Sequence, residues 1–341
     1  MAAANPRSEP ASAPVSRVLR IDSGASLPGE AILRLAIEVV LPAVRPIKPL
    51  VFVCLPGGGM NRNFYNLAAT APDGTADPSF SFAQAMSARG YMVVLLDYLG
   101  LGESDKPVDG YALTPELLVQ ANARATGLVL ERLRTGTLFG DLDVMPELRS
   151  IGVGHSMGAM LTVLQQARHR QHVGLVLLGF GTSGLPEYLK PEVRELAADT
   201  AAVRARVVEF AREMFKQPYP RITRSPRGND LYGSANVDSR GVNALKAAIE
   251  PILPVPAYMS MLPGNVAPEA ARIEVPILLG IGDRDMVGPP ERVPASFPAS
   301  RNVVLHILPE TGHSHFLFPA RAGLFERVAE WADRVATPVQ K

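Results

Sequence analysis

One serine, Ser156, lies in the stretch "GHSMG", directly after the strand-like run "SIGV" and at the start of the helical pattern "MGAMLTVLQQA". This G-x-S-x-G pattern is typical of a tight strand-to-helix turn, in which small residues let strand and helix approach and the hydroxyl projects above the sheet. A serine hydroxyl is a poor nucleophile at neutral pH, so it needs a base to take its proton and an acid to orient that base. The pattern therefore predicts nucleophilic chemistry at Ser156, with partners elsewhere in the chain.

Two loops downstream of Ser156 contain candidate partners. The loop "DRDMVGPP" follows the strand-like run "PILLGIG" and contains Asp283 and Asp285, and the loop "ETGHSHF" follows "NVVLHILP" and contains His313 and His315. Loops at the carboxyl ends of parallel strands are where α/β proteins assemble their sites. The chain order serine, aspartate, histidine predicts a nucleophile–acid–base set, with two candidates each for the acid and the base.

Short apolar runs alternate with longer helical patterns along most of the chain, as a parallel sheet covered on both faces requires. In the segment "TPELLVQANARATGLVLERLR", Thr114 is a plausible N-cap and Pro115 occupies the first helical position. We expect a doubly wound α/β fold with a mostly parallel sheet of about eight strands. The runs that predict strands are "LRLAIEVVL", "LVFVCLP", "YMVVLLDY", "SIGVG", "VGLVLLGF", "PILLGIG" and "NVVLHILP".

The alternation is interrupted at two places. Residues 1–17 are rich in Ala, Pro and Ser, which indicates a flexible N-terminal tail. Residues 182–265 give helical patterns and Pro-rich loops without a convincing strand, and strand-like "VPILLGIG" follows. We therefore expect a core built from residues 18–181 and 266–341, with residues 182–265 inserted as a helical unit.

Four motifs in order resemble those of the α/β-hydrolase superfamily, over nearly everything except the tail and the insertion. "LPGGGMNRNF" is similar to the oxyanion loop, "DYLGLGESDKP" to the D-x-x-G-x-G-x-S segment, "GHSMG" to the nucleophile elbow, and "GDRD" with "GHSH" to the acid and base loops. One departure is Pro56, which stands where many relatives carry His before the glycines. The resemblance implies the α/β-hydrolase fold with a helical cap at residues 182–265, after the sixth strand.

The resemblance also implies a role for each candidate. Ser156 would be the nucleophile, His313 the general base, and Asp285 the acid, because the family's acid usually falls third after the glycine, here Gly282. Asp283 would then be a loop residue. His315 is the rival of His313 as base, but the Gly-His pairing favours His313, so His315→Ala is expected to be mild.

The oxyanion of acyl transfer needs two N–H donors in this superfamily. The resemblance assigns one donor to Met157, the residue after the nucleophile, and the other to Gly58 of the "PGGG" loop. The neighbouring elbow residue His155 is expected to point away from the serine.

A pocket lined by adaptable apolar side chains, with little fixed charge, is expected around the serine. A basic series in the insertion, which includes Arg204, Arg206, Arg212, Arg224 and Arg227, is interrupted by acidic and apolar residues and is interpreted as a solvated face rather than an anion site. The residues expected to contact the substrate are Gly59, Tyr98, Met160, Tyr258, Met259 and Met261.

Composition limits the possible partners. A net charge of +1 gives no bias toward polyanions, so nucleic acid is not expected. The apolar runs are shorter than the roughly 18 residues of a membrane-spanning helix, and no apolar segment follows the N-terminus as in a secretory signal, which favours a cytoplasmic location. The histidine spacings and the single cysteine, Cys54, predict no metal site, and the "PGGG" stretch does not complete a phosphate-binding pattern, so no cofactor is expected. The sequence leaves the oligomeric state open.

These observations favour a serine hydrolase that acts on a neutral, medium-sized carboxylic ester or lactone through an acyl-enzyme. The same residues are compatible with cleavage of a carbon–carbon bond in a diketone-like substrate or with acyl transfer. Some proteins of the resembled fold are non-catalytic receptors of small molecules, so the fold alone does not establish catalysis.

Overall fold

The computed structural model describes residues 15–42, 44–140, 142–221 and 236–336. Most of the tail expected over residues 1–17 lies outside this part of the chain. Its last two residues belong to a strand, β1 (Ser16–Asp22), which pairs along its whole length with β2 (Arg34–Val40). Strand β1 was not predicted, because it is an edge strand whose side chains are mostly exposed or half-buried and do not form an apolar run.

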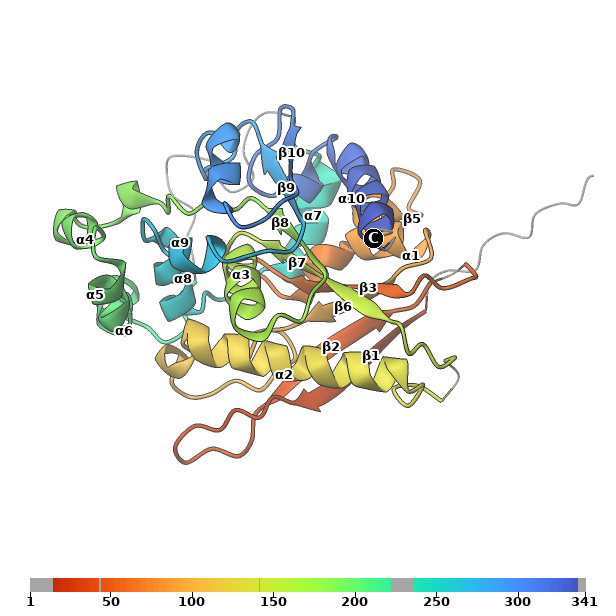
Figure 1. The fold of residues 1–341 in the computed structure, drawn as a ribbon, viewed down its shortest axis with the longest axis horizontal. Coiled ribbons are helices and arrows are strands. Elements are labelled where there is room, and N and C mark those ends of the chain that lie inside the picture. Colours follow the sequence, from red (N-terminus) through yellow and green to blue (C-terminus); the bar gives the residue numbers. More distant parts are fainter. Residues whose placement is uncertain (1–14, 43, 141, 222–235, 337–341) are drawn as a thin grey trace, which may run out of the picture.

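The predicted mixed, mostly parallel sheet is confirmed and has eight strands in the order β1-β2-β6-β3-β7-β8-β9-β10 (Figure 1). Strands β1 and β2 are antiparallel to their neighbours, and all pairs from β6 to β10 are parallel. A short hairpin, β4 (Ala69–Thr70) with β5 (Ala76–Asp77), lies outside the sheet. The remaining strands are β3 (Leu50–Leu55), β6 (Met92–Leu96), β7 (Arg149–His155), β8 (Gly174–Leu178), β9 (Ile277–Gly282) and β10 (Val303–Leu308).

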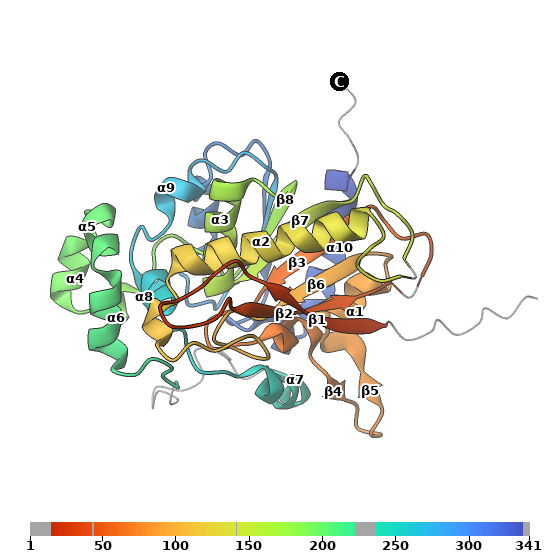
Figure 2. The ribbon, with the colours of Figure 1, turned by 90° about the horizontal axis from the view of Figure 1, so that it is seen from below.

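Helices cover both faces of the sheet, because side chains alternate between the faces along each buried strand. In β3, Val51 and Val53 join the core cluster that includes apolar residues of α2 (Pro115–Arg134) and α3 (Met157–His169). The intervening Phe52 joins the opposite cluster with α1 (Phe82–Ser87) and α10 (Arg321–Ala336). Figure 2 shows α2 lying over one face of the sheet. The predicted cap of α2 is confirmed, since the Thr114 side chain accepts a hydrogen bond from the Leu117 amide.

Between β8 and β9, the described residues form helices and no strand of the main sheet. Figures 1 and 2 place the first three of these helices to one side of the sheet. The helices are α4 (Pro191–Leu196), α5 (Thr200–Ala205), α6 (Val207–Phe215), α7 (Ser239–Leu245), α8 (Pro254–Met261) and α9 (Ala267–Ala270).

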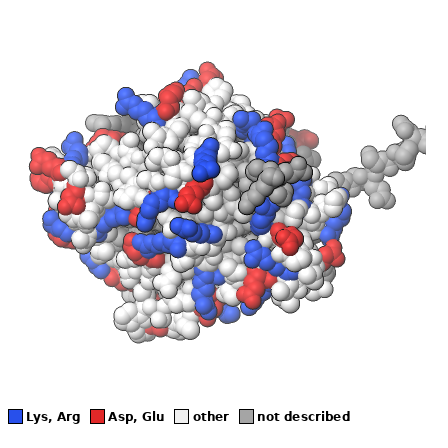
Figure 3. Space-filling model, viewed as in Figure 1, with Lys and Arg blue, Asp and Glu red and all other residues white. Residues whose placement is uncertain are grey.

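Three described members of the basic series lie close to carboxylates. Arg204 donates to Glu269, Arg206 to Glu209 and Arg212 to Asp109, whereas Arg224 and Arg227 fall outside the described residues. Charges of both signs are interspersed over the face in Figure 3. Within the described ranges, no helix has the length and apolar character needed to cross a bilayer.

Candidate active site

Ser156 lies in a strained turn between β7 and α3, with φ 54° and ψ −121°. A non-glycine residue rarely adopts this conformation, and such strain persists only where the surrounding packing imposes it. Two close approaches impose it here. A Cβ atom at Gly154 would lie 2.4 Å from Cα of Ala159, and one at Gly158 would lie 2.2 Å from the carbonyl oxygen of Leu55. The glycines on either side of Ser156 are therefore required by packing of the strands against α3.

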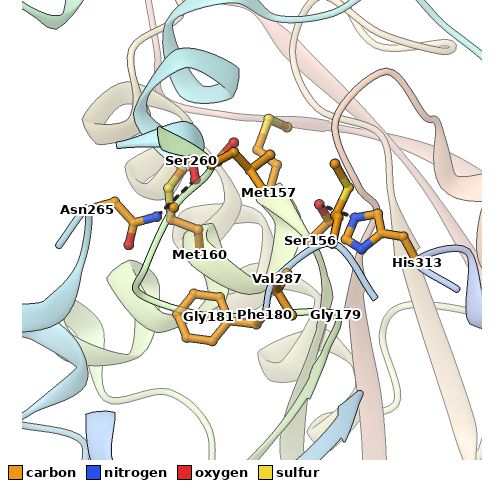
Figure 4. A pocket seen from close by; sticks show the side chains of 13 residues that line it. Ser156, Met157, Met160, Gly179, Phe180, Gly181, Ser260, Asn265, Val287 and His313 are labelled. Atoms are coloured by element: carbon orange, nitrogen blue, oxygen red, sulfur yellow. Dashed lines mark hydrogen bonds between the residues drawn. The ribbon is translucent and has the colours of Figure 1, made fainter. Parts of the chain in front are cut away.

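A chain of hydrogen bonds joins the three loops that follow β7, β9 and β10. Ser156 Oγ lies 2.7 Å from Nε2 of His313 (Figure 4). On the other side of the ring, Nδ1 of His313 lies 2.8 Å from Oδ1 of Asp285. A carboxylate only accepts, so Nδ1 carries the proton and Nε2 is free to accept from the serine hydroxyl. The side chains of Asp285 and His313 are 0% and 4% exposed. The structure thus brings together the serine, histidine and aspartate that the sequence singled out.

The two candidate acids have different surroundings. Asp283 accepts backbone hydrogen bonds from Glu310 and Thr311, at 2.9 and 3.0 Å, and so ties the two loops together. Asp285 instead contacts two histidines. Burial raises the pKa of the Asp285 carboxyl, but His313 and His315 outweigh burial and hold the pKa well below its ordinary value. Asp285 therefore stays ionised although its side chain is shielded from solvent.

His155 points away from Ser156 and supports the loop that contains His313. Its Nε2 lies 2.8 Å from the backbone carbonyl oxygen of His313. Burial, together with the neighbouring His313 and His315, lowers the pKa of His155 well below its ordinary value. The neutral ring donates from Nε2 and packs close to the chain at Gly57, where a Cβ atom would lie 2.7 Å from Nδ1.

The two candidate oxyanion donors are neighbours. A Cβ atom at Gly58 would lie 3.6 Å from Sδ of Met157, so the loop after β3 meets the first turn of α3. Tyr98, expected in the pocket, is instead fully buried and donates from its hydroxyl to the carbonyl oxygen of Pro56, at 2.8 Å. Tyr98 thereby fixes the loop that contains Gly58.

A cavity of about 40 Å³ opens beside Ser156 and His313. Met157 and Met160 line it, and Figure 4 shows Ser260 and Asn265 on the side away from the serine. Among the residues expected to contact a substrate, only Met160 is in this lining.

The other expected contacts lie elsewhere in the fold. Tyr258 and Met259 are 3% and 2% exposed and belong to the core cluster, with the Tyr258 ring 6.0 Å from that of Phe210. Met261 packs against the same cluster. Gly59 accepts a backbone hydrogen bond from Glu250, at 2.8 Å, on the inserted segment.

The stretch "GFGTSGLP" was not predicted from the sequence to belong to the site. It supplies more of the cavity lining than any other loop, and Met286 and Val287 of the acid loop also line the cavity. Its position could have predicted this role, because the stretch follows the parallel strand β8 at the edge of the sheet where sites assemble. Its lining residues are Gly179, Phe180, Gly181, Gly184 and Leu185.

The sequence model of the alpha/beta hydrolase family matches residues 52–322 of the chain. No curated protein sequence matches it. Solved structures share its fold at low sequence identity. A carboxyl esterase from Bacillus coagulans is 15% identical over 94% of this chain and 99% of its own, with a TM-score of 0.64.

Two further structures show the same relation. An esterase from Thermogutta terrifontis is 18% identical over 94% of this chain and 100% of its own, with a TM-score of 0.56. A monoacylglycerol lipase from Paleococcus ferrophilus is 17% identical over 89% of this chain and 100% of its own, with a TM-score of 0.57. At these identities the likeness is one of fold.

Proposed function

The chain belongs to the alpha/beta hydrolase family, and on that basis we propose that it hydrolyses carboxylic esters or lactones through a Ser156–His313–Asp285 triad. The observation that carries the proposal is the unbroken hydrogen-bond chain from the serine hydroxyl to a buried carboxylate. A base that already accepts from the hydroxyl is in position to take its proton as the oxygen attacks a carbonyl carbon.

The proposed reaction has two halves. Ser156 Oγ bonds to the carbonyl carbon while its proton passes to Nε2 of His313, and the imidazolium then protonates the departing alkoxide to leave an acyl-serine. In the second half, His313 takes a proton from water, hydroxide bonds to the acyl carbon, and the serine recovers its proton. Asp285 holds Nδ1–H throughout and stabilises the transient imidazolium.

The negative oxygen of each tetrahedral intermediate needs donors that are fixed in advance. We propose the backbone N–H groups of Met157 and Gly58 for this role, since these two residues meet directly beside Ser156. The bond from Tyr98 to Pro56 supports the role of Gly58, because it holds the loop without using the amides that would face the oxyanion.

The lining of the cavity favours a neutral substrate. Its described residues are apolar, glycine, Ser, Asn and His, and include no Asp, Glu, Lys or Arg. The volume of about 40 Å³ favours a short acyl group. We propose a neutral ester or lactone of moderate size, with residues 182–265 acting as a cap, because both ends of this segment contribute to the lining through Leu185 and Ser260. A cytoplasmic location stays a prediction.

The test is a panel of neutral esters, lactones and diketones, assayed with wild type and with Ser156→Ala, together with a fluorophosphonate probe. We expect turnover of esters or lactones by wild type, its loss in Ser156→Ala, and peptide mass spectrometry to find the probe on Ser156. Turnover confined to diketones would indicate carbon–carbon bond cleavage by the same triad. Binding without turnover or labelling would indicate a receptor and refute the proposal.

A further inference from the structure

The carboxylate of Asp285 has two histidine partners, one on each oxygen. Oδ1 lies 2.8 Å from Nδ1 of His313, and Oδ2 lies 2.9 Å from Nε2 of His315. We propose that His315 is a positioning residue that holds Asp285 in the orientation from which it can orient His313. This inference rests on the proposed triad and adds a fourth member to it.

With the contact from His315, both oxygens of the buried Asp285 carboxylate have hydrogen-bond donors. Oδ1 also accepts from the Val287 backbone amide, at 3.2 Å, so Oδ2 depends on the imidazole of His315. The side chains of Asp285 and His315 are both 0% exposed, so water cannot replace the donor. A buried carboxylate oxygen left without a partner is costly, and the carboxylate would turn or take up a proton to avoid that cost.

The direction of the bond is fixed by chemistry. The carboxylate accepts, so Nε2 of His315 donates, and Nδ1 is buried without a hydrogen-bond partner among the described residues. His315 therefore makes one side-chain hydrogen bond in this part of the chain, and that bond goes to the acid of the triad.

His315 is placed to support the base rather than to replace it. Its backbone amide donates to the carbonyl oxygen of His313, at 3.1 Å, so the turn H-S-H wraps both rings around one carboxylate. His313 lies between Asp285 and Ser156, whereas His315 contacts the other carboxylate oxygen. This contact changes the expectation of a mild effect for the removal of His315.

The consequence for catalysis follows from the tautomer of His313. If Asp285 turns, Nδ1–H of His313 loses its acceptor, and the ring no longer presents a fixed lone pair at Nε2 to the serine. In metal sites, loss of a residue that hydrogen-bonds to a ligating side chain and orients it typically costs about 10–100-fold in activity. We expect a loss of similar size when Asp285 loses His315. Because the substrate does not contact His315, the loss should appear in kcat and not in KM.

The experiment compares His315→Leu with His315→Gln on a neutral ester that wild type turns over. Leucine fills the space without a donor, whereas the Gln side-chain amide can donate to Oδ2. We expect His315→Leu to lower kcat about 10–100-fold with KM within about twofold of wild type, and His315→Gln to recover most of the loss. Fluorophosphonate labelling of Ser156 should slow by the same factor as kcat.

The matched control is His172→Leu. His172 is also buried, and its Nδ1 forms a hydrogen bond of 2.9 Å with Oγ of Ser150. Ser150 lies at the opposite end of β7 from Ser156. We expect this variant to lose thermal stability while the folded protein keeps wild-type kcat. A drop in stability alone therefore cannot imitate the effect expected for His315→Leu.

A double-mutant cycle isolates the route through Asp285. In the Asp285→Asn background, His315→Leu should have little further effect on kcat, because the group that His315 positions is already altered. The inference is overturned if His315→Leu keeps kcat within about twofold of wild type, or if its loss is the same in both backgrounds. Either result leaves the triad intact, whereas activity retained by Ser156→Ala refutes the triad itself. If His315→Leu does not fold, His315→Met, which also lacks a donor, takes its place in the same cycle. A loss of kcat that largely disappears in the Asp285→Asn background would support the inference, and an equal loss in both backgrounds would refute it.

Discussion

Gly179 leaves room for the triad, and substitution to alanine should disturb catalysis more than stability. This residue directly follows β8 and has a φ of 55°. A Cβ atom there would lie 3.0 Å from three atoms of the site: Oδ2 of Asp285, and Cε1 and Nδ1 of His313. Both of these side chains are buried, so neither can swing into solvent to make space.

The magnitude follows from that distance. A comfortable contact begins near 3.4 Å, so the imidazole and the carboxylate must together move by a few tenths of an ångström. Since a misplacement of 1 Å can cost about 100-fold in rate, we expect a loss of roughly tenfold in kcat. The positive φ adds about 1–2 kcal/mol of strain for a residue with a Cβ atom.

The assay measures kcat and KM on a short neutral ester together with the melting temperature by circular dichroism. The control is Gly74→Ala, because Gly74 has a φ of 85° and nothing within 4 Å of the added methyl group. Both variants should lose similar stability, and only Gly179→Ala should lose kcat. Wild-type kcat in Gly179→Ala, at a stability equal to that of Gly74→Ala, would refute the idea that the triad needs this space.

Three further predictions concern acids and charge. On acidification, kcat/KM should fall along a single ionisation, with a slope of one in a plot of log rate against pH, because the low pKa of Asp285 keeps its carboxylate charged; a slope of two would show that a second essential group protonates. Burial lowers the pKa of His172 to about 4, so the unfolded chain binds its proton more tightly and stability is lost as pH falls from about 6.5 toward 4. His172→Leu should flatten that loss, by up to roughly 3 kcal/mol at the acid end in urea unfolding, and an unchanged pH slope would contradict the assignment. Neutral esters should give higher kcat/KM than carboxylate-bearing esters of equal length, because the cavity lining described has no cationic side chain to pair with the charge; preference for the charged series would point to a basic group outside that lining.

The sequence was most informative where a local rule and the tertiary structure agree. The apolar runs predicted seven of the strands, and the turn at Ser156 was predicted because strand, glycines and helix occur in the right order. The loops of Asp285 and His313 were predicted from their position after parallel strands, and the resemblance to the family selected these two residues over Asp283 and His315. These are features in which a few neighbouring residues determine the geometry.

The expected pocket residues that lie outside the cavity lining make contacts that depend on distant parts of the chain. Tyr98 has the size and polarity of a pocket residue, but its hydroxyl reaches the backbone of Pro56. Met259 belongs to a helix whose apolar side turns into the core. The three glycines and Phe180 in "GFGTSGLP" carry no reactive group, so nothing in their side chains marks the stretch as part of a cavity.

The order of the strands fixes how far apart the nucleophile and the acid lie. Ser156 follows β7 and Asp285 follows β9, with β8 between them. Neighbouring strands are about 4.8 Å apart, so these two loops start about 9.6 Å apart. One imidazole with a hydrogen bond of 2.7 Å on one side and 2.8 Å on the other bridges most of that width. The spacing of the strands thus fixes the distance between the nucleophile and the acid. The chain can lengthen between β8 and β9, as it does over residues 182–265, without changing the distance that the histidine must bridge.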